Sequence, residues 1–176
     1  MDYKTRPLSR RTIRRLSKYL RKAFGVSVEG PFPVMECLDK LKDVFKNCNY
    51  DVLEDNEFEK NVMARCVPND FGGYTIEIRE SVYEGAYKKR IGAYLGFICH
   101  EICHVFLFRI GYTPVFERSF KDNTINRSRS VEWQAKALCG ETMVPFEESK
   151  GMGVERLMSY YRVSKGFADF RLKMDE

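Results

Sequence analysis

The chain has 176 residues, of which 44% are hydrophobic and 14% aromatic, and its formal net charge at pH 7 is +5. This composition excludes a disordered or fibrous chain and suits one globular domain with a packed core, which we expect to span residues 1–176. The N-terminus is polar and basic with no apolar run behind it, and no apolar segment is long enough to cross a bilayer. We therefore expect a cytoplasmic protein that has no membrane contact.

Residues 1–25 are expected to form a basic N-terminal helix. Ser9 can cap its start, Gly25 follows its end, and an apolar stripe between them repeats at helical spacing. The stripe consists of Ile13, Leu16, Leu20 and Phe24. The first 22 residues hold nine Lys or Arg and one Asp, a net charge of +8, so the remaining residues sum to −3. We expect these charges to form the solvated side of a packed helix, with nucleic acid or an acidic partner as the alternative.

The next segment predicts one helix and a small sheet. Pro31 and Pro33 mark a loop, and helical periodicity then runs from residue 34 to 45. Three strands are expected over residues 50–53, 62–67 and 74–82, the last because Tyr74, Ile76 and Ile78 alternate with polar residues. If this last strand borders a functional cleft, its edge could hold an extended peptide, although a plain core strand fits equally well.

Residues 96–107 carry the strongest functional signal. They form an apolar run that predicts a helix ending near Gly111, and they include His100, Glu101 and His104. Residues four apart lie on the same face of an α-helix, so both imidazoles can bind one ion while Glu101 projects beside them. This HExxH pattern is typical of a catalytic zinc site in which the Glu is the general base.

The six cysteines are expected to be free thiols, because they lie in predicted helices and strands of a chain without an export signal. They are Cys37, Cys48, Cys66, Cys99, Cys103 and Cys139. Cys99 and Cys103 each lie about 100° around the helix from a motif histidine. We therefore expect both to be small core residues rather than metal ligands.

A catalytic zinc needs a third protein ligand, and the chain has no further histidine. Residues 112–130 predict a long polar loop, and residues 131–144 predict a helix that Ser130 can cap and Pro145 ends. Glu132 on this helix is the preferred ligand, because a helix holds a side chain more rigidly than a loop does. The rivals are Glu117, Asp122, Glu141 and Cys139, and the helical pattern alone leaves Glu132 and Glu141 open.

These residues predict metal-assisted peptide hydrolysis in which Glu101 accepts a proton from water and returns it to the leaving amine. The oxyanion would need a donor, for which Tyr112, Arg127 and Tyr74 are unranked candidates. The competing hypothesis is a binding module for DNA or protein that keeps a structural metal, closed by a fourth ligand such as Cys139. A third possibility is an immunity or toxin role that depends on binding a partner.

The segment His-Glu-Ile-Cys-His-Val-Phe-Leu, followed by Glu-Trp-Gln-Ala at 132–135 and Met-Val-Pro at 143–145, resembles the ImmA/IrrE family of intracellular zinc metallopeptidases. Their pattern is HEIGH, then E-x-x-A-N-x-F-A, then L-L-M-P. The resemblance extends weakly over most of the chain, including the tail within residues 151–176, where we expect a small C-terminal helical extension. It implies an α+β, minimal zincin-like fold with a small mixed sheet, flanking helices and the motif on a central helix.

The resemblance also implies roles for particular residues. His100, His104 and Glu132 would bind Zn²⁺, Glu101 would be the catalytic acid/base, and the substrate could be a helix-turn-helix transcriptional repressor whose cleavage derepresses a mobile element or stress genes. The chain departs from the family pattern at three places, which bear on substrate fit and leave the ligands and the base intact. These are Cys103 for Gly, Lys136 for Asn or Asp, and Leu138-Cys139 for Phe-Ala.

Overall fold

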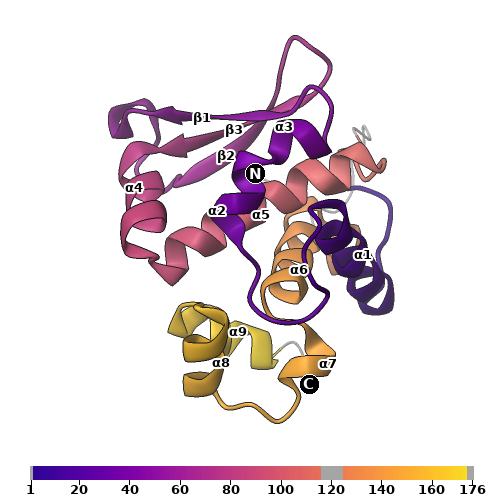
Figure 1. Cartoon of the computed structure of the whole chain (residues 1–176). Coiled ribbons are helices and arrows are strands. Elements are labelled where there is room, and N and C mark those ends of the chain that lie inside the picture. Colours follow the sequence, from indigo (N-terminus) through magenta and orange to yellow (C-terminus); the bar gives the residue numbers. More distant parts are fainter. Residues whose placement is uncertain (1, 116–124, 174–176) are drawn as a thin grey trace.

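The computed structural model of the chain describes residues 2–115 and 125–173, and within them it is a mixed α+β structure (Figure 1). The strands are β1 (Asn49–Leu53), β2 (Ala64–Pro68) and β3 (Tyr74–Arg79). The helices are α1 (Arg10–Ala23), α2 (Val34–Asp39), α3 (Leu41–Val44), α4 (Glu80–Lys89), α5 (Gly92–Arg109), α6 (Val131–Met143), α7 (Phe146–Ser149), α8 (Val154–Tyr161) and α9 (Lys165–Lys173). Short 3-10 turns lie at Asp55–Glu57 and Arg127–Arg129. The expected α+β class with a small mixed sheet is confirmed.

The three strands form one sheet in the order β1-β3-β2, with β1 parallel and β2 antiparallel to β3. Ile76 and Ile78 of β3 are fully buried, in agreement with the alternation of the sequence. The third strand was expected to reach residue 82, but α4 begins at Glu80.

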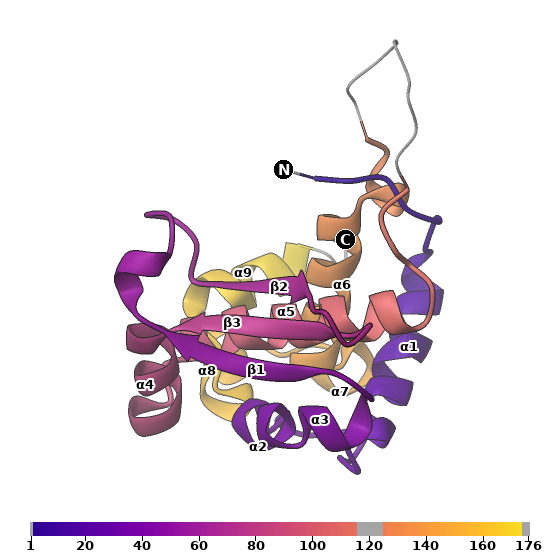
Figure 2. The same cartoon turned by 90° about the horizontal axis from the view of Figure 1, so that it is seen from above.

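The idea that this third strand offers its edge to a peptide is wrong, because β3 is hydrogen-bonded on both sides. Figure 2 shows β1 on the side of α2 and α3, and β2 at the opposite edge of the sheet. Within residues 2–115 and 125–173, no further strand pairs with the outer edge of β2, which the sequence did not single out.

The N-terminal helix α1 confirms the predicted cap and stripe. Ser9 Oγ accepts a hydrogen bond from Thr12 N, and Ile13 and Leu20 are buried where α1 packs against α6. Its basic residues are not all on the solvated face, because Arg21 is fully buried.

The predicted helix over residues 34–45 is interrupted at Lys40, so that α2 and α3 are two short helices. Helix α5 is the central element and its residues from Ile98 to Leu107 are mostly buried. It ends at Arg109, just before Gly111, whose φ of +91° a residue with a side chain rarely adopts. The predicted end near Gly111 is confirmed.

No single helix in the described ranges is both long and apolar enough to cross a membrane. Helices α4 and α5 pass that test only when taken together, and they meet at a bend of 116°.

The last two helices dock on the start of α5. A Cβ atom placed on Gly92 would lie 2.7 Å from the backbone carbon of Val163 and 2.8 Å from the carbonyl oxygen of Arg162, in the turn between α8 and α9. Only a glycine allows this close backbone approach. Figure 1 shows α8 and α9 together at one end of the molecule, and the docking brings α9 next to the helix that carries the motif.

Candidate metal centre

The two histidines of the chain lie one turn apart on α5 and face each other. Their Nε2 atoms are 3.0 Å apart, and the planes of the two rings are nearly perpendicular, at 87°. His104 is 5% exposed, whereas His100 lies closer to solvent. The helical spacing alone produces this pair, as the sequence predicted.

Glu132 brings a carboxylate to the same point from α6. Its Oε2 lies 3.3 Å from His100 Nε2, and its Oε1 lies 3.5 Å from His104 Nε2. Contact with the two imidazoles lowers the pKa of Glu132 far below its usual value. The structure therefore joins two ligands that are local in sequence with a third that is 28 residues further along the chain.

The start of α6 holds Glu132 in place. Ser130 Oγ accepts a hydrogen bond from Trp133 N and donates one to Asp2 Oδ2, at 2.9 and 2.6 Å. Asp2 Oδ1 in turn accepts a hydrogen bond from Glu132 N at 3.2 Å. Sequence reasoning missed Asp2, and its only signal was that it is the sole acid among the first 22 residues.

The ligand atoms of His100, His104 and Glu132 all lie within 4.8 Å of one another, so this group could hold a metal ion. A neutral imidazole has one nitrogen that donates and one that accepts, and a carboxylate only accepts. The two facing ring nitrogens and the Glu132 carboxylate therefore offer more acceptors than donors. The donor set fits a divalent cation, which would use both ring nitrogens and the carboxylate as acceptors.

Glu101 lies beside this group and is not part of it. It is 9% exposed, and burial raises its pKa to about 7, with a further contribution from the charge of Glu132. The charge of His100 and a hydrogen bond with the backbone of Cys66 in β2 act in the opposite direction. A carboxyl group that can be charged or neutral near pH 7 is therefore held between the histidines and the edge strand.

A cleft of about 1000 Å³ opens over these residues. Its walls include β2 on one side and the N-terminal residues Asp2 and Tyr3 together with Val131 on the other. Of the three candidate oxyanion donors, Tyr74 lines the cleft and packs its ring against Phe108 with a centroid separation of 5.1 Å. The other two are not among the residues that line it.

The rival ligands have other positions. Glu141 pairs with Arg171 at 3.0 Å and accepts a hydrogen bond from Phe146 N. Cys139 is buried, and its Sγ lies 3.6 Å from the carbonyl oxygen of Gly96. Glu117 and Asp122 lie outside the described residues.

The six cysteines are free thiols. Cys99 and Cys103 are fully buried in the core, the position that the sequence predicted for them. The pKa values of both are raised. The Cys103 thiol lowers the pKa of Cys99, but the Cys139 thiol and burial outweigh it, and burial and both neighbouring thiols raise the pKa of Cys103. Neither residue therefore favours the thiolate form that binds metals.

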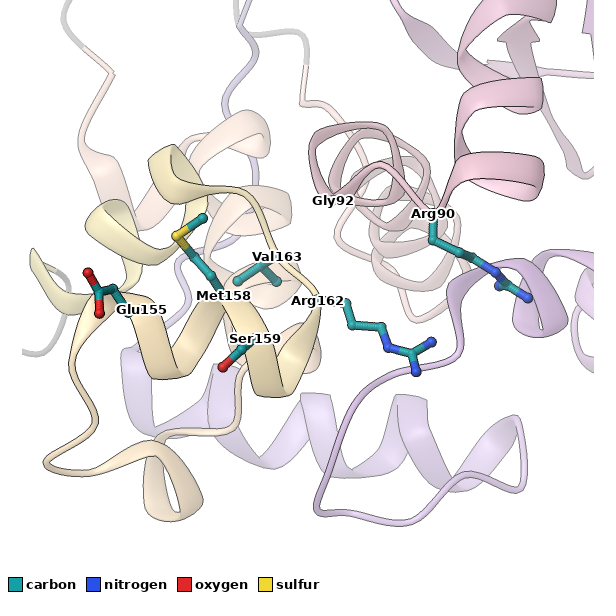
Figure 3. Close-up of a pocket in the computed structure, with 7 residues that line it drawn as sticks. All are labelled: Arg90, Gly92, Glu155, Met158, Ser159, Arg162 and Val163. Carbon is teal, nitrogen blue, oxygen red and sulfur yellow. The ribbon is translucent and has the colours of Figure 1, made fainter.

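A separate hollow of about 480 Å³ lies between Arg90, which follows the end of α4, and helix α8 (Figure 3). It shares no lining residue with the cleft. Its two guanidinium groups, from Arg90 and Arg162, lie on one side of α8, and the carboxylate of Glu155 lies on the other. These polar groups do not converge on one point, in contrast to the three ligands in the cleft.

A scan against protein-family models finds no match to this chain, and a search of curated proteins finds none either.

Proposed function

We propose that this protein is a zinc-dependent endopeptidase with a zincin-like fold, of the kind that the ImmA/IrrE family represents. The observation that carries the proposal is the geometry of one cleft. Two histidines and a glutamate face a common point there, a buried glutamate lies beside them, and the edge strand β2 lines the same cleft.

The distances between the ligand atoms support zinc. A tetrahedral Zn²⁺ bound at about 2.0–2.2 Å separates its ligand atoms by about 3.3–3.6 Å. The three pairs formed by His100, His104 and Glu132 measure 3.0, 3.3 and 3.5 Å. Three protein ligands leave one position for water or substrate, which is typical of catalytic zinc, whereas structural sites have four protein ligands. Cys139, which a closed site could have used, is not in the ligand group of the described residues.

When bound, zinc would supply a Lewis acid for a peptide carbonyl and lower the pKa of water. Glu101 is the proton carrier of this proposal: its carboxylate accepts a proton from the attacking water and then donates it to the leaving amine. Its buried position beside His100, His104 and Glu132 suits both steps, because the carboxylate lies next to the point where these ligands would hold the metal. Tyr74 is the best placed of the three oxyanion candidates, since it lines the cleft.

The edge of β2 supports a peptide as the substrate. An extended chain could pair with this strand through backbone hydrogen bonds, which hold a peptide irrespective of its sequence. Residues 61–66 and Pro68 line the cleft along this edge. A protein substrate with an extended segment fits this site, and an intracellular helix-turn-helix repressor is the substrate that the resemblance implies.

The test uses Glu101→Gln, which removes the proton carrier and keeps the size of the side chain. We expect this variant to bind zinc with unchanged stoichiometry, measured by elemental analysis, and to cleave a co-expressed repressor from the neighbouring gene about 10²- to 10⁴-fold more slowly. Fragments are followed by mass spectrometry. Glu84→Gln, an exposed change on α4, is the matched control and should cleave like the wild type. Undiminished cleavage by Glu101→Gln would show that the assignment of the base is wrong.

A further inference from the structure

A second pocket, of about 400 Å³, adjoins the metal cleft and shares Phe97 and His100 with it. We call it the side pocket. Three aromatic residues line it, of which Phe97 belongs to α5, and Phe167 and Phe170 belong to α9. A pocket of this size and lining is typical of sites that bind an apolar group.

Small residues on α5 create the space. Ala93 and Gly96 are the residues that α5 presents to the side pocket before Phe97, and Gly166 opens it on the side of α9. A Cβ atom on Gly96 would lie 3.5 Å from the ring of Phe167, so α9 packs close to the motif helix. A Cβ atom on Gly166 would meet nothing within 4 Å. The volume therefore depends on small residues at these positions.

One cation borders the side pocket. Lys136 of α6 is exposed, and its Nζ lies 4.3 Å from the centre of the Phe170 ring. This cation–π contact holds the positive charge on the pocket wall. It disfavours Lys or Arg in the pocket, because like charges repel where solvent is partly excluded.

We propose that the side pocket binds a bulky apolar side chain of the substrate, such as Phe, Leu or Met, at a position next to the scissile bond. This inference rests on the proposed function. Because His100 forms a wall of both spaces, a peptide held in the cleft places a neighbouring residue at the entrance of the side pocket. Helix α9, at the C-terminal end of the described chain, then determines which residue is accepted.

The first experiment profiles cleavage of a proteome-derived peptide mixture by the zinc-loaded protein, with the cut sites identified by mass spectrometry. We expect at least a tenfold preference for bulky apolar residues over Ala and over Lys at one position beside the cut. Gly166→Leu adds a side chain beside the pocket without a clash and should shift this preference to Ala and Gly. Gly153→Leu, at an exposed glycine that also meets nothing within 4 Å, is the matched control and should leave the profile unchanged.

The second experiment needs no turnover. N-acetyl-phenylalanine amide should shift the amide resonances of Ala93, Gly96 and Phe167 in NMR spectra, N-acetyl-lysine amide should not, and Gly166→Leu should abolish the shifts. If the protein cleaves peptides without an apolar preference, or if Gly166→Leu leaves the preference unchanged, the inference is wrong and the proposed function stands. If no peptide is cleaved but the phenylalanine probe binds as expected, the proposed function fails and the apolar preference of the pocket stands. Equal binding of both probes, or of neither, would overturn the inference.

Discussion

Two polar clusters lie at opposite ends of α6, and they differ in whether their hydrogen bonds are complete. At the C-terminal end, Arg21 donates to the backbone oxygens of Ser27, Glu29, Gly30 and Thr142, at 2.6 to 3.1 Å. All five guanidinium donors have an acceptor there. This cluster, which we call the arginine clamp, fastens the loop after α1 to the end of α6.

At the N-terminal end of α6, the metal centre has the opposite balance. The two ring nitrogens and the Glu132 carboxylate face one another, and acceptors outnumber donors. A buried cluster with matched donors and acceptors stabilises a fold by itself, whereas one with converging acceptors is completed by a cation. We therefore expect the arginine clamp to stabilise the fold without metal, and the three ligands to stabilise it only when a metal is bound.

The largest expected effect is the response to zinc. At a free zinc concentration about 1000 times the dissociation constant, binding should raise the free energy of unfolding by about 4 kcal/mol. Glu132→Gln should lose most of this gain, because it replaces an anionic ligand with a neutral amide. Denaturant unfolding with zinc and with a chelator measures the difference. If zinc stabilises Glu132→Gln as much as the wild type, Glu132 is not a ligand. Glu84→Gln is the control, which zinc should stabilise fully.

Loss of the arginine clamp should have a somewhat smaller effect on stability, and this effect should not depend on zinc. Arg21→Met leaves buried backbone oxygens without donors and should lower the free energy of unfolding by roughly 3 kcal/mol. The loss should be the same with zinc as with a chelator, in the same unfolding assay. Arg15→Met, at an exposed position on the same helix, should change stability by less than about 0.5 kcal/mol. A loss that appears only with zinc would show that the two ends of α6 are coupled.

The smallest expected effect comes from removing a helix N-cap, and it can show whether Ser130 also positions the ligand Glu132. Ser130→Ala and Ser9→Ala each remove a helix N-cap, so each should lower the free energy of unfolding by about 1 kcal/mol in the absence of metal. Only Ser130 also bonds to Asp2 beside Glu132. Ser130→Ala should therefore weaken zinc affinity about 10- to 100-fold, and Ser9→Ala should leave it unchanged, as measured by competition with a chelating dye. Equal zinc affinities in the two variants would show that the cap does not position the ligand.

Features set by neighbouring residues could be read from the sequence. The helical repeat places His100 and His104 on one face whatever surrounds them, and Ser9 and Ser130 cap their helices through bonds to residues three positions on. The existence of the three strands followed from alternation and turn residues. Their ends were less accurate, because the pattern of residues 74–82 does not show where a strand passes directly into a helix.

Features set by distant residues were decided by the tertiary structure. Glu132 and Glu141 are equally good carboxylates on one helix. The packing of α5 against α6 brings Glu132 to the histidines, whereas Glu141 pairs with Arg171 of α9. Likewise, the pairing of β3 on both sides makes β1 and β2 the edge strands, of which β2 lines the cleft, and docking on Gly92 brings α9 beside the motif helix. The physical reason is the range of the interactions. Backbone hydrogen bonding within a helix has a fixed period that the sequence displays, whereas packing between elements depends on surfaces that meet only in the folded chain.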